Sequence, residues 1–473
     1  MKEIQLSEIK KNTIASIDYL GRDGKVLIRK GASISDTLLS AILRRNISKL
    51  YVQEEGEDIK KLLNLQELDH FNIEDLPVYD PGDLADSGGG APEKIVMDIK
   101  PPERVLPILL SIKRGEEGVA QFLKTESVKK LEDALATNRI ALTVAPAGTP
   151  VKDIAKEIAT GARSQEYKAG ITTDYEHTIA EIKNLFQNIK NGRPVQAGRF
   201  TGLVKGFIKT YLNDKHMLLN LANARSVESD YIYAHSVNVC LLAISIAASR
   251  GFDQDQINDI GTGALLHDAG ALLIADEIRF KQEPLTRDEI FEVQKHPMLG
   301  IHLIEKIQGL PEIAQLICYQ THERENRQGY PKQRNGHIIH DYAKIVSVAD
   351  VYESLTSERP YRPSVVPYKA MEFVLKAVKQ GLFSTETVKY FLEYTSLFPV
   401  GSLVKLSTGE IGKVIKPNGS LYSRPVVAVI IGADNRLLPE EEVRTLDLKG
   451  NHDIKIIQAI DNLKLNIEVM RGF

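Results

Sequence analysis

The feature that most restricts the fold is a change in hydrophobic period near Thr172. From there to about residue 397, apolar residues recur at positions i, i+3 and i+4, as in EHTIAEIKNLFQNIK and YIYAHSVNVCLLAISIAA. This period is typical of helices that bury one face or all of their surface, and not of strands. We therefore expect a large all-α domain at residues 171–397.

The chain before this domain has different patterns. Residues 1–77 alternate in short apolar runs, with one helical segment after Ser35 and Asp36, and predict a small α+β module. Residues 78–94 are rich in Pro, Gly, Asp and Ser, as linkers are. Residues 95–170 mix helical runs with the strand-like run RIALTVAPA, and predict a second small α/β module.

After the helical domain the pattern changes again. Residues 398–450 contain three alternating runs, two of them separated by the turn sequence TGE, and predict a small antiparallel β module. Residues 451–473 are expected to be a C-terminal tail. The 473 residues thus indicate a multidomain, mainly α protein.

The composition restricts the cellular context. The chain is 43% hydrophobic and 26% charged with a net charge of -3, which favours neither a nucleic-acid polymer nor a membrane surface as partner. Its longest apolar stretch, VCLLAISIAA, is shorter than the ~20 residues of a membrane span. Cys240 and Cys318 lack CxxC spacing and are expected to be buried and reduced. We expect a cytoplasmic protein.

Histidines are concentrated in the predicted helical domain. Seven of the eleven fall between residues 235 and 350, which indicates a metal site. The candidates in apolar or turn-rich contexts recur about every 30 residues, which is the length of one helix and its connection. A helical bundle that delivers one ligand per helix to a common interior point would have this spacing. The candidate positions are His235, His267, His296, His322 and Asp350.

The segment GALLHDAG adds a sixth candidate beside His267. Asp268 follows it inside an apolar run, and Gly270 indicates that the helix is ending there. An aspartate has two oxygens and can bridge two ions, whose charge stabilises a carboxylate in an apolar wall. His302, His337 and His340 are expected to make surface contacts or local hydrogen bonds instead.

The order of the motifs resembles that of the HD-GYP family, a branch of the HD metal-dependent phosphohydrolases. The resemblance runs through YAHSVNV, GALLHDAG, FEVQKHPMLGIHLI, THERENRQGYP and ADVYESLTSERPYR. The GYP at residues 329–331 separates this branch from other HD hydrolases.

The resemblance implies a phosphodiesterase that hydrolyses cyclic di-GMP to the linear dinucleotide or to GMP, by attack of a metal-bound hydroxide on phosphorus. It implies two divalent ions, iron or manganese first, with zinc left open. His267 and Asp268 would be both ligands and catalytic residues. The ligand positions that match are His235, His267, Asp268, His296, His322 and Asp350.

Three further residues match positions near the substrate. Arg359 and Arg362 correspond to places that hold substrate phosphate, for which paired guanidinium donors are suited; a salt-bridged loop is the alternative. Tyr330 would stack on a guanine or support its loop. The GYP loop also offers a surface for a protein partner, and the oligomeric state is left open.

The sequence departs from the family pattern at several positions. Ala271 replaces the lysine that ends the HDxGK motif, Thr321 replaces a histidine of the HHE motif, and Tyr231 replaces a carboxylate that holds a third ion in some members. We therefore expect at most two ions. Two alternatives follow: a weakened or inactive protein that regulates by binding a nucleotide or partner, and an HD hydrolase for another nucleotide.

Overall fold

The structure, a computed structural model, describes residues 2–5, 9, 13–14, 19–20, 26–28, 33–43, 49–52, 125–156, 165–222, 231–359 and 364–460. It divides into two compact units, Met1–Asp69 and His70–Phe473. The predicted linker at 78–94 lies outside the described residues, as does the first part of the predicted second module.

The smaller unit is an α+β module. Strands β1 (Lys2–Gln5), β6 (Lys49–Val52), β3 (Tyr19–Leu20) and β4 (Val26–Ile28) form one sheet in that order. Strands β2 (Thr13–Ile14) and β5 (Ser33–Ile34) pair separately. Helix α1 (Asp36–Leu43) begins after Ser35, whose hydroxyl accepts a hydrogen bond from Leu38 N, as the predicted cap requires. The core of the unit contains Ile28, Ile34, Leu39, Ile42 and Leu50.

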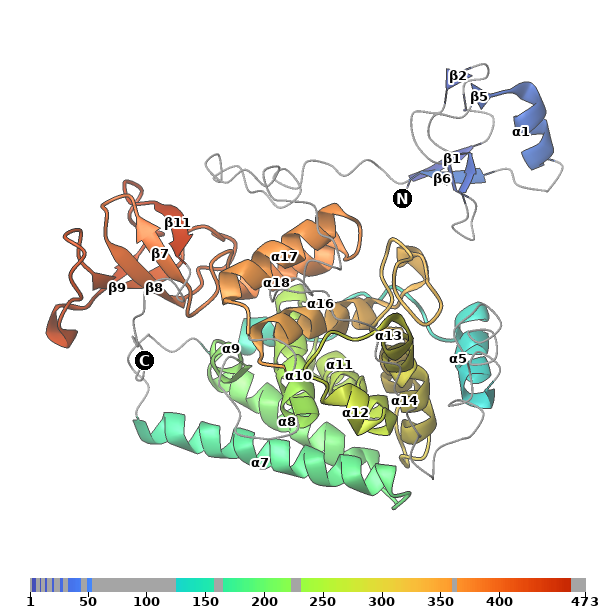
Figure 1. The fold of residues 1–473 in the computed structure, drawn as a ribbon, viewed down its shortest axis with the longest axis horizontal. Coiled ribbons are helices and arrows are strands. Elements are labelled where there is room, and N and C mark those ends of the chain that lie inside the picture. Colours follow the sequence, from blue (N-terminus) through green and yellow to red (C-terminus); the bar gives the residue numbers. More distant parts are fainter. Residues whose placement is uncertain are drawn as a thin grey trace. The chain divides into compact units, whose positions relative to one another are not determined.

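The larger unit is mainly helical, which confirms the predicted fold class (Figure 1). Its longer helices are α7 (Gln165–Lys190), α8 (Ala197–Asn213), α10 (Tyr231–Arg250), α11 (Gln254–Leu266), α16 (Asp341–Thr356), α17 (Pro367–Lys379) and α18 (Thr385–Thr395). Its shorter helices are α9 (Met217–Ala222), η4 (Ala269–Leu273), α12 (Asp276–Arg279), α13 (Arg287–Gln294), α14 (His296–Ile304), α15 (Glu312–Gln320) and η5 (Gly336–Ile338).

Helix α10 is the central element of this helical domain. Every residue from Ile232 to Ala248 is buried, and the helix packs against α9, α11, α16 and α18. Its 20 residues are long and apolar enough to cross a membrane, yet the whole of that apolar window is buried inside the protein. The run that the sequence shows as continuously apolar is therefore explained by burial on all sides.

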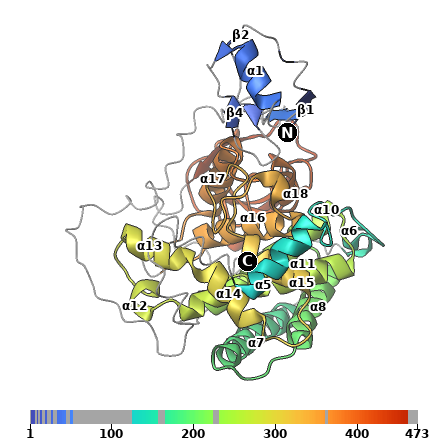
Figure 2. The same cartoon turned by 90° about the vertical axis from the view of Figure 1, so that its right-hand side faces the viewer.

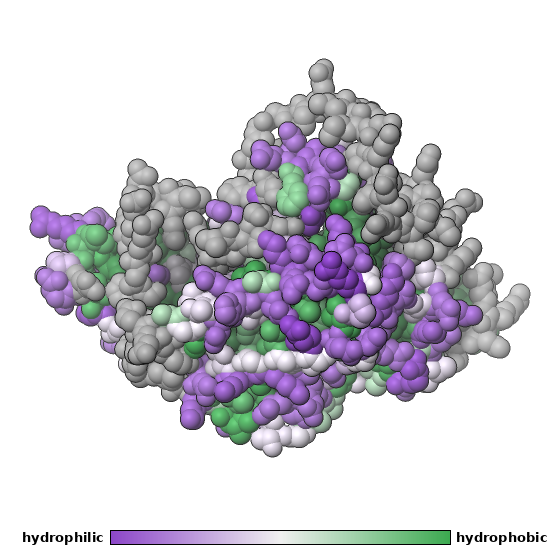
Figure 3. Space-filling view, turned by 90° about the horizontal axis from the view of Figure 1, so that it is seen from below, coloured by the Kyte–Doolittle hydropathy of each residue, from purple (hydrophilic) through white to green (hydrophobic). Residues whose placement is uncertain are grey.

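Helix α7 lies along one side of the domain (Figure 1). Its buried residues Tyr175, Ile179, Ile182 and Phe186 recur every three or four positions, so that one stripe faces the core. The face of the molecule seen in Figure 3 is mainly hydrophilic, with apolar residues in small, separate patches.

Residues 125–156 differ from the predicted α/β module. Helix α5 (Glu126–Ala136) and the short α6 (Val151–Ile154) are present, but residues 139–147 form no strand, so that prediction is wrong. The backbone of this segment instead bonds to the helical domain: Val144 N donates to Asp341 Oδ2 at 3.0 Å. Alternation of apolar residues reports partial burial, which an extended segment lying on helices also produces.

A five-stranded antiparallel sheet follows the helices. Its strand order is β10-β9-β8-β7-β11, and its strands are β7 (Leu403–Leu406), β8 (Ile411–Lys416), β9 (Val426–Ile431), β10 (Arg444–Asp447) and β11 (Ile456–Ile460). The β7–β8 hairpin turns at Gly409, with φ +88°, within the predicted TGE turn. Strand β11 pairs with β7, so the sheet extends into residues that we expected to be a tail.

The remaining histidines make local contacts, as expected. His302 bonds to Glu305 and His337 to Asn335. His340 is buried and caps α16, because its Nδ1 accepts a hydrogen bond from Tyr342 N at 3.0 Å. Burial lowers the pKa of His340 to about 4, with Asp341 opposing and Lys344 adding to that shift.

Because the pKa of His340 is lowered on folding, its neutral form stabilises the protein above pH 6.5, and this stability is lost as the pH falls toward 4. Between pH 7.5 and pH 5 the loss should be about 2 kcal/mol. We expect His340→Asn, which keeps a capping acceptor, to reduce the pH-dependent fall in the free energy of unfolding by that amount. Urea denaturation at both pH values measures it. The exposed His337→Asn is the control, and an equal fall in wild type and His340→Asn would contradict the prediction.

Candidate metal centre

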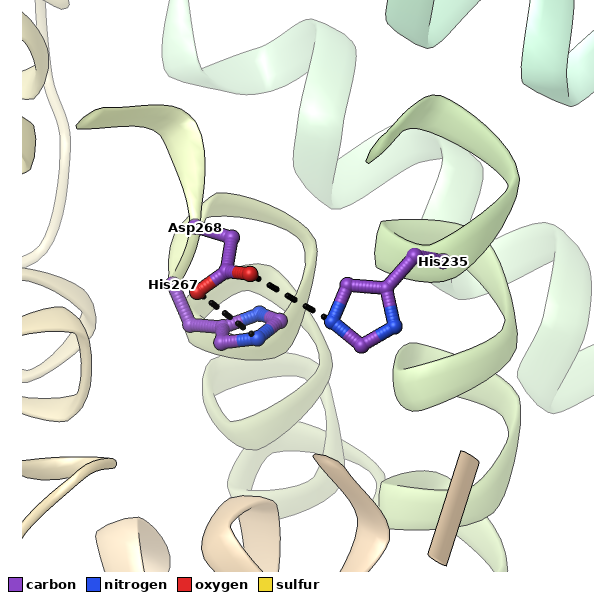
Figure 4. A group of neighbouring side chains, drawn as sticks. All are labelled: His235, His267 and Asp268. Carbon is purple, nitrogen blue, oxygen red and sulfur yellow. Dashed lines mark ion pairs between the residues drawn. The ribbon is translucent and has the colours of Figure 1, made fainter. Parts of the chain in front are cut away.

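The six predicted ligand residues come from five helices or their ends and meet inside the helical domain. His235 lies in the second turn of α10, and Asp350 lies in the middle of α16. His267 and Asp268 follow the last residue of α11, before the 3-10 helix η4. Figure 4 shows the Asp268 carboxylate directed toward the imidazoles of both His235 and His267. The two others are His296, the first residue of α14, and His322, just after α15.

Asp268 is at the centre of the cluster. Its Oδ1 lies 3.2 Å from His267 Nε2, 3.1 Å from His296 Nε2 and 3.1 Å from His322 Nε2. Its Oδ2 lies 3.4 Å from His235 Nε2. The two oxygens of one carboxylate therefore face different groups of imidazoles, which is the arrangement that a bridging ligand requires.

Asp350 lies against three of the same histidines. Its Oδ1 is 3.4 Å from His235 Nε2 and 3.8 Å from His267 Nε2, and its Oδ2 is 3.6 Å from His322 Nδ1. Two carboxylates thus face one set of imidazoles: Asp268, just after α11, and Asp350, in the middle of α16.

The donor atoms form three overlapping groups, each with its atoms within 4.8 Å of one another. The groups are His235, His267 and Asp268; His267, His322 and Asp350; and Asp268, His296 and His322. Two donors bound at right angles to one ion, each about 2.1 Å from it, are about 3 Å apart, close to several of these separations.

The residues fit a metal ion in two further ways. His267 is fully buried, and its Nε2 faces Asp268 Oδ1 at 3.2 Å without a regular hydrogen bond, so a nitrogen inside the protein is directed at the cluster. The donors are imidazole nitrogens and carboxylate oxygens without a thiolate, a set that suits iron, manganese or zinc. These residues could hold divalent ions.

The charges in the cluster stabilise the ionised forms of its two carboxylates. Burial alone would raise the pKa of Asp268, but the imidazoles of His267 and His296 hold it well below its usual range. The pKa of Asp350 is also lowered well below its usual range, against the effect of burial, by the imidazoles of His235 and His267. Burial, together with the neighbouring His296, lowers the pKa of His322 to about 4. Two carboxylates and a neutral imidazole therefore face one another.

Backbone carbonyls orient two of the imidazoles. His267 Nδ1 donates to Ala264 O at 2.8 Å, and His296 Nδ1 donates to Val293 O at 2.7 Å. Each bond places the proton on Nδ1 and leaves Nε2 free of hydrogen toward the cluster, as a metal ligand must be.

His235 is oriented by a carboxylate that the sequence analysis missed. Its Nδ1 donates to Glu353 Oε2, and Glu353 also accepts from Asn238 Nδ2 at 3.1 Å. Burial alone would raise the pKa of Glu353, but His235 and Arg359 lower it to about 2. The sequence contains one signal that could have identified Glu353: it is an acidic residue three positions after Asp350, on the same face of a buried helix.

Arg359 contacts both His235 and the carboxylate of Glu353 that orients it. Its guanidinium donates to Glu353 Oε2 at 3.1 Å, lies 2.9 Å from His235 Nδ1 and covers the Tyr231 ring at 4.5 Å. The structure contains the salt bridge that we considered as the alternative, between Arg359 and Glu353. The contact of Arg359 with substrate phosphate stays a prediction. Arg362 lies outside the described residues.

The Tyr330 ring lies against the imidazole of His322, one of the candidate metal ligands. Its ring is parallel to that of His322 at an interplanar angle of 1° and a centroid distance of 5.1 Å. Gly329 permits this approach, because a Cβ there would lie 2.3 Å from Arg324 N. The expected contact with a guanine stays a prediction.

Two of the three departures from the motif pattern, Thr321 and Ala271, leave positions without a metal ligand or a cation. Thr321 is buried, and its hydroxyl donates to Ile317 O at 2.7 Å along its own helix. Ala271 lies in η4 and contributes no charge. Among the described residues, Asp268, His296 and His322 make up the donor group on that side of the cluster.

Comparison with known proteins agrees with this geometry. A family model described as HD domain matches residues 210–384, and one described as KOW domain associated with HD domain matches residues 403–467. A cyclic di-GMP phosphodiesterase of Pseudomonas aeruginosa is 28% identical over 275 residues, which cover 58% of this chain and 66% of that protein.

Two other relatives match shorter stretches. The cyclic di-GMP phosphodiesterase response regulator RpfG of Xanthomonas campestris is 31% identical over 38% of this chain and 47% of its own length. The 3'3'-cGAMP-specific phosphodiesterase 2 of Vibrio cholerae is 29% identical over 39% of this chain and 35% of its own length. The matched part of the chain thus spans between about a third and two thirds of these relatives.

The fold and the histidine–aspartate cluster define an HD-type domain with a candidate metal centre. Residues 210–384 match an HD domain, and GYP at residues 329–331 is the sequence by which this domain resembles the HD-GYP branch.

Gly270 allows α14 to approach η4 closely. A Cβ at this position would lie 1.9 Å from His296 O and 2.3 Å from Gly300 N. We expect Gly270→Ala to destabilise the protein by about 2 kcal/mol, because backbone must move, and to weaken manganese binding by displacing His296. Urea denaturation and manganese titration measure the two effects. Gly202→Ala, on α8 with open space around it, should be neutral or stabilising by up to about 1 kcal/mol. Equal behaviour of the two variants would refute this packing role.

Glu353 is expected to set the metal affinity through His235. Glu353→Gln keeps the size and a carbonyl acceptor but removes the charge that orients and polarises the imidazole. Metal affinity should fall about 10- to 100-fold. Manganese titration by electron paramagnetic resonance measures this change directly. The exposed Glu358→Gln is the control; unchanged affinity in Glu353→Gln would show that His235 does not depend on this carboxylate.

Proposed function

We propose that this protein is a metal-dependent phosphodiesterase that hydrolyses cyclic dinucleotides, cyclic di-GMP first among them. The observation that carries the proposal is the convergence of six nitrogen and oxygen donors from successive helices, with Asp268 facing two sides. The matched relatives are named as phosphodiesterases of cyclic di-GMP and of 3'3'-cGAMP, which supports a cyclic dinucleotide as substrate. The products would be the linear dinucleotide or GMP.

The proposed ligands are the residues of the three donor groups. Divalent ions held there, two in number and iron or manganese by the donor chemistry, would activate water and screen the phosphate charge. Asp268 would bind on both sides, and His267 would bind beside it. His235 would be oriented toward the ions by Glu353.

Arg359, Arg362 and Tyr330 complete the proposal as substrate-binding residues. Arg359 and Tyr330 line the approach to His235 and His322, and contact of Arg359 and Arg362 with phosphate would follow if the ion pair with Glu353 rearranged. A cytoplasmic location, a protein partner at the GYP loop and an oligomer are proposals of the sequence alone.

A regulatory protein is the second candidate, and a specific observation favours it. Thr321 directs its hydroxyl to Ile317 O, and Ala271 offers no cation, so two positions that the family uses contribute nothing here. Such a protein would bind metal and nucleotide but turn over slowly or not at all.

Replacement of Asp268 tests the enzyme directly. We expect wild type with added manganese or ferrous iron to hydrolyse cyclic di-GMP, and Asp268→Ala to lose metal and at least about 100-fold in kcat. The exposed Asp255→Ala, at the other end of α11, should keep both. Metal content and chromatography of the products are the readouts.

Each competing function has its own result in this experiment. Wild type that binds metal and nucleotide without turnover under any metal is a regulator. Turnover confined to 3'3'-cGAMP or another nucleotide keeps the hydrolase and replaces its substrate.

A further inference from the structure

Helix α5 lies outside the stretch matched by the HD domain model, yet it packs on the helices that carry the site. Val128, Leu131 and Ala134 form its buried side. Ser127 bonds to Glu305, just after α14, and Arg139 forms a paired ion contact with Glu312 at the start of α15. Figure 2 shows α5 alongside α14 and α15.

One side chain of α5 reaches the GYP loop. Glu132 Oε1 accepts from Tyr319 Oη at 2.7 Å, lies 3.1 Å from Lys332 Nζ and is paired with Arg334. Tyr319 is fully buried in α15, whereas Lys332 and Arg334 follow the GYP sequence itself. A single carboxylate therefore joins α5, α15 and the loop.

A second carboxylate holds the same loop from the opposite side. Glu323 Oε1 accepts from Lys332 N, and Glu323 Oε2 accepts from Arg334 N, each at 2.7 Å. Glu323 is the residue after the candidate ligand His322. The loop segment 332–334 is thus fixed between Glu323 through its backbone and Glu132 through its side chains.

Arg334 depends on Glu132 because its guanidinium is charged and buried. Its side chain is only 7% exposed and lies over the Tyr319 ring, and its Nε is 3.8 Å from Glu323, beyond hydrogen-bond distance. Removal of Glu132 would leave a buried guanidinium without its direct carboxylate partner, which is strongly unfavourable. The loop would move to return Arg334 to water.

Movement of the loop would reach the metal centre by two contacts. Tyr330 N donates to His322 O at 3.0 Å, and the Tyr330 ring is stacked on the His322 imidazole. Gly329 also packs against the backbone of Glu323. The imidazole of His322 is therefore held by the loop that Glu132 holds.

We propose that Glu132 is a positioning residue of the metal centre, supplied from outside the HD domain, which fixes the GYP loop through Arg334 and thereby the imidazole of His322. A force or ligand that displaces α5 would loosen this loop, so the contact is also a route by which upstream residues of the chain could act on the site. The consequence for metal binding rests on the proposed function, whereas the consequence for the loop does not.

The experiment compares variants of the full-length protein. Glu132→Ala removes the acceptor and the charge, Glu132→Gln keeps an acceptor of the same size, and Glu126→Gln is the control. Glu126 is on the same helix, is exposed and pairs only with Lys130 in the contacts described. The readouts are hydrogen exchange of the amides of residues 329–336 and manganese titration by electron paramagnetic resonance.

We expect exchange at Lys332 and Arg334 to become about 10-fold faster in Glu132→Ala, because their amide bonds to Glu323 open more often. Manganese affinity should fall by about 10-fold, at the low end of the contribution of residues that support metal ligands. Glu132→Gln should lie between Glu132→Ala and wild type, and Glu126→Gln should match wild type.

Failure of this inference and failure of the proposed function give different results. Unchanged loop exchange in Glu132→Ala, whether or not the melting temperature falls, overturns the inference, and so does faster loop exchange with unaltered manganese binding. Absence of metal binding in wild type refutes the proposed function, whereas the exchange measurement still decides whether Glu132 holds the loop.

Discussion

The larger unit depends on the electrostatic balance around two carboxylates in its helical core, the partly buried Asp268 and the buried Asp350. Carboxylates in a helical core are costly unless positive charge or hydrogen bonds compensate them. Here four imidazoles surround them at 3.1 to 3.8 Å, and the imidazoles hold their pKa values well below the usual range against the effect of burial. Cations in the same place would balance the two carboxylates further. The helices α10, α11, α14, α15 and α16, or their ends, each deliver one part of this balance.

A second layer of carboxylates supports the first. Glu353 orients His235, Glu323 holds the backbone after GYP, and Glu132 holds the charged side chains of the same loop. None of the three was identified as functional from the sequence. Glutamates are common on helices and usually solvated, and their role here depends on partners that come from other parts of the chain. Arg359, predicted from the sequence as a phosphate contact, pairs in the structure with Glu353.

The sequence predicted the architecture where a signal is local. The helical period over 171–397 and the mainly α class agree with the structure, as does the TGE turn of the β7–β8 hairpin. It was wrong for residues 139–147, which lie extended on the helices, and for the tail, where β11 joins the sheet by pairing with β7. In both cases the deciding contacts are made with distant residues, so the local pattern of apolar side chains was insufficient.

The sequence by itself determined which residues could meet, because the recurrence of His235, His267, His296 and His322 about one helix apart is set by helix length and connection alone. Only the tertiary structure decided how they meet. Close packing at Gly270, where a side chain would collide with His296 O, sets the approach of α14 to η4. The contacts of Glu132 with Tyr319 and Arg334 join residues 187 and 202 positions apart. Contacts at such separations are fixed by the packing of whole helices, and no local pattern encodes them.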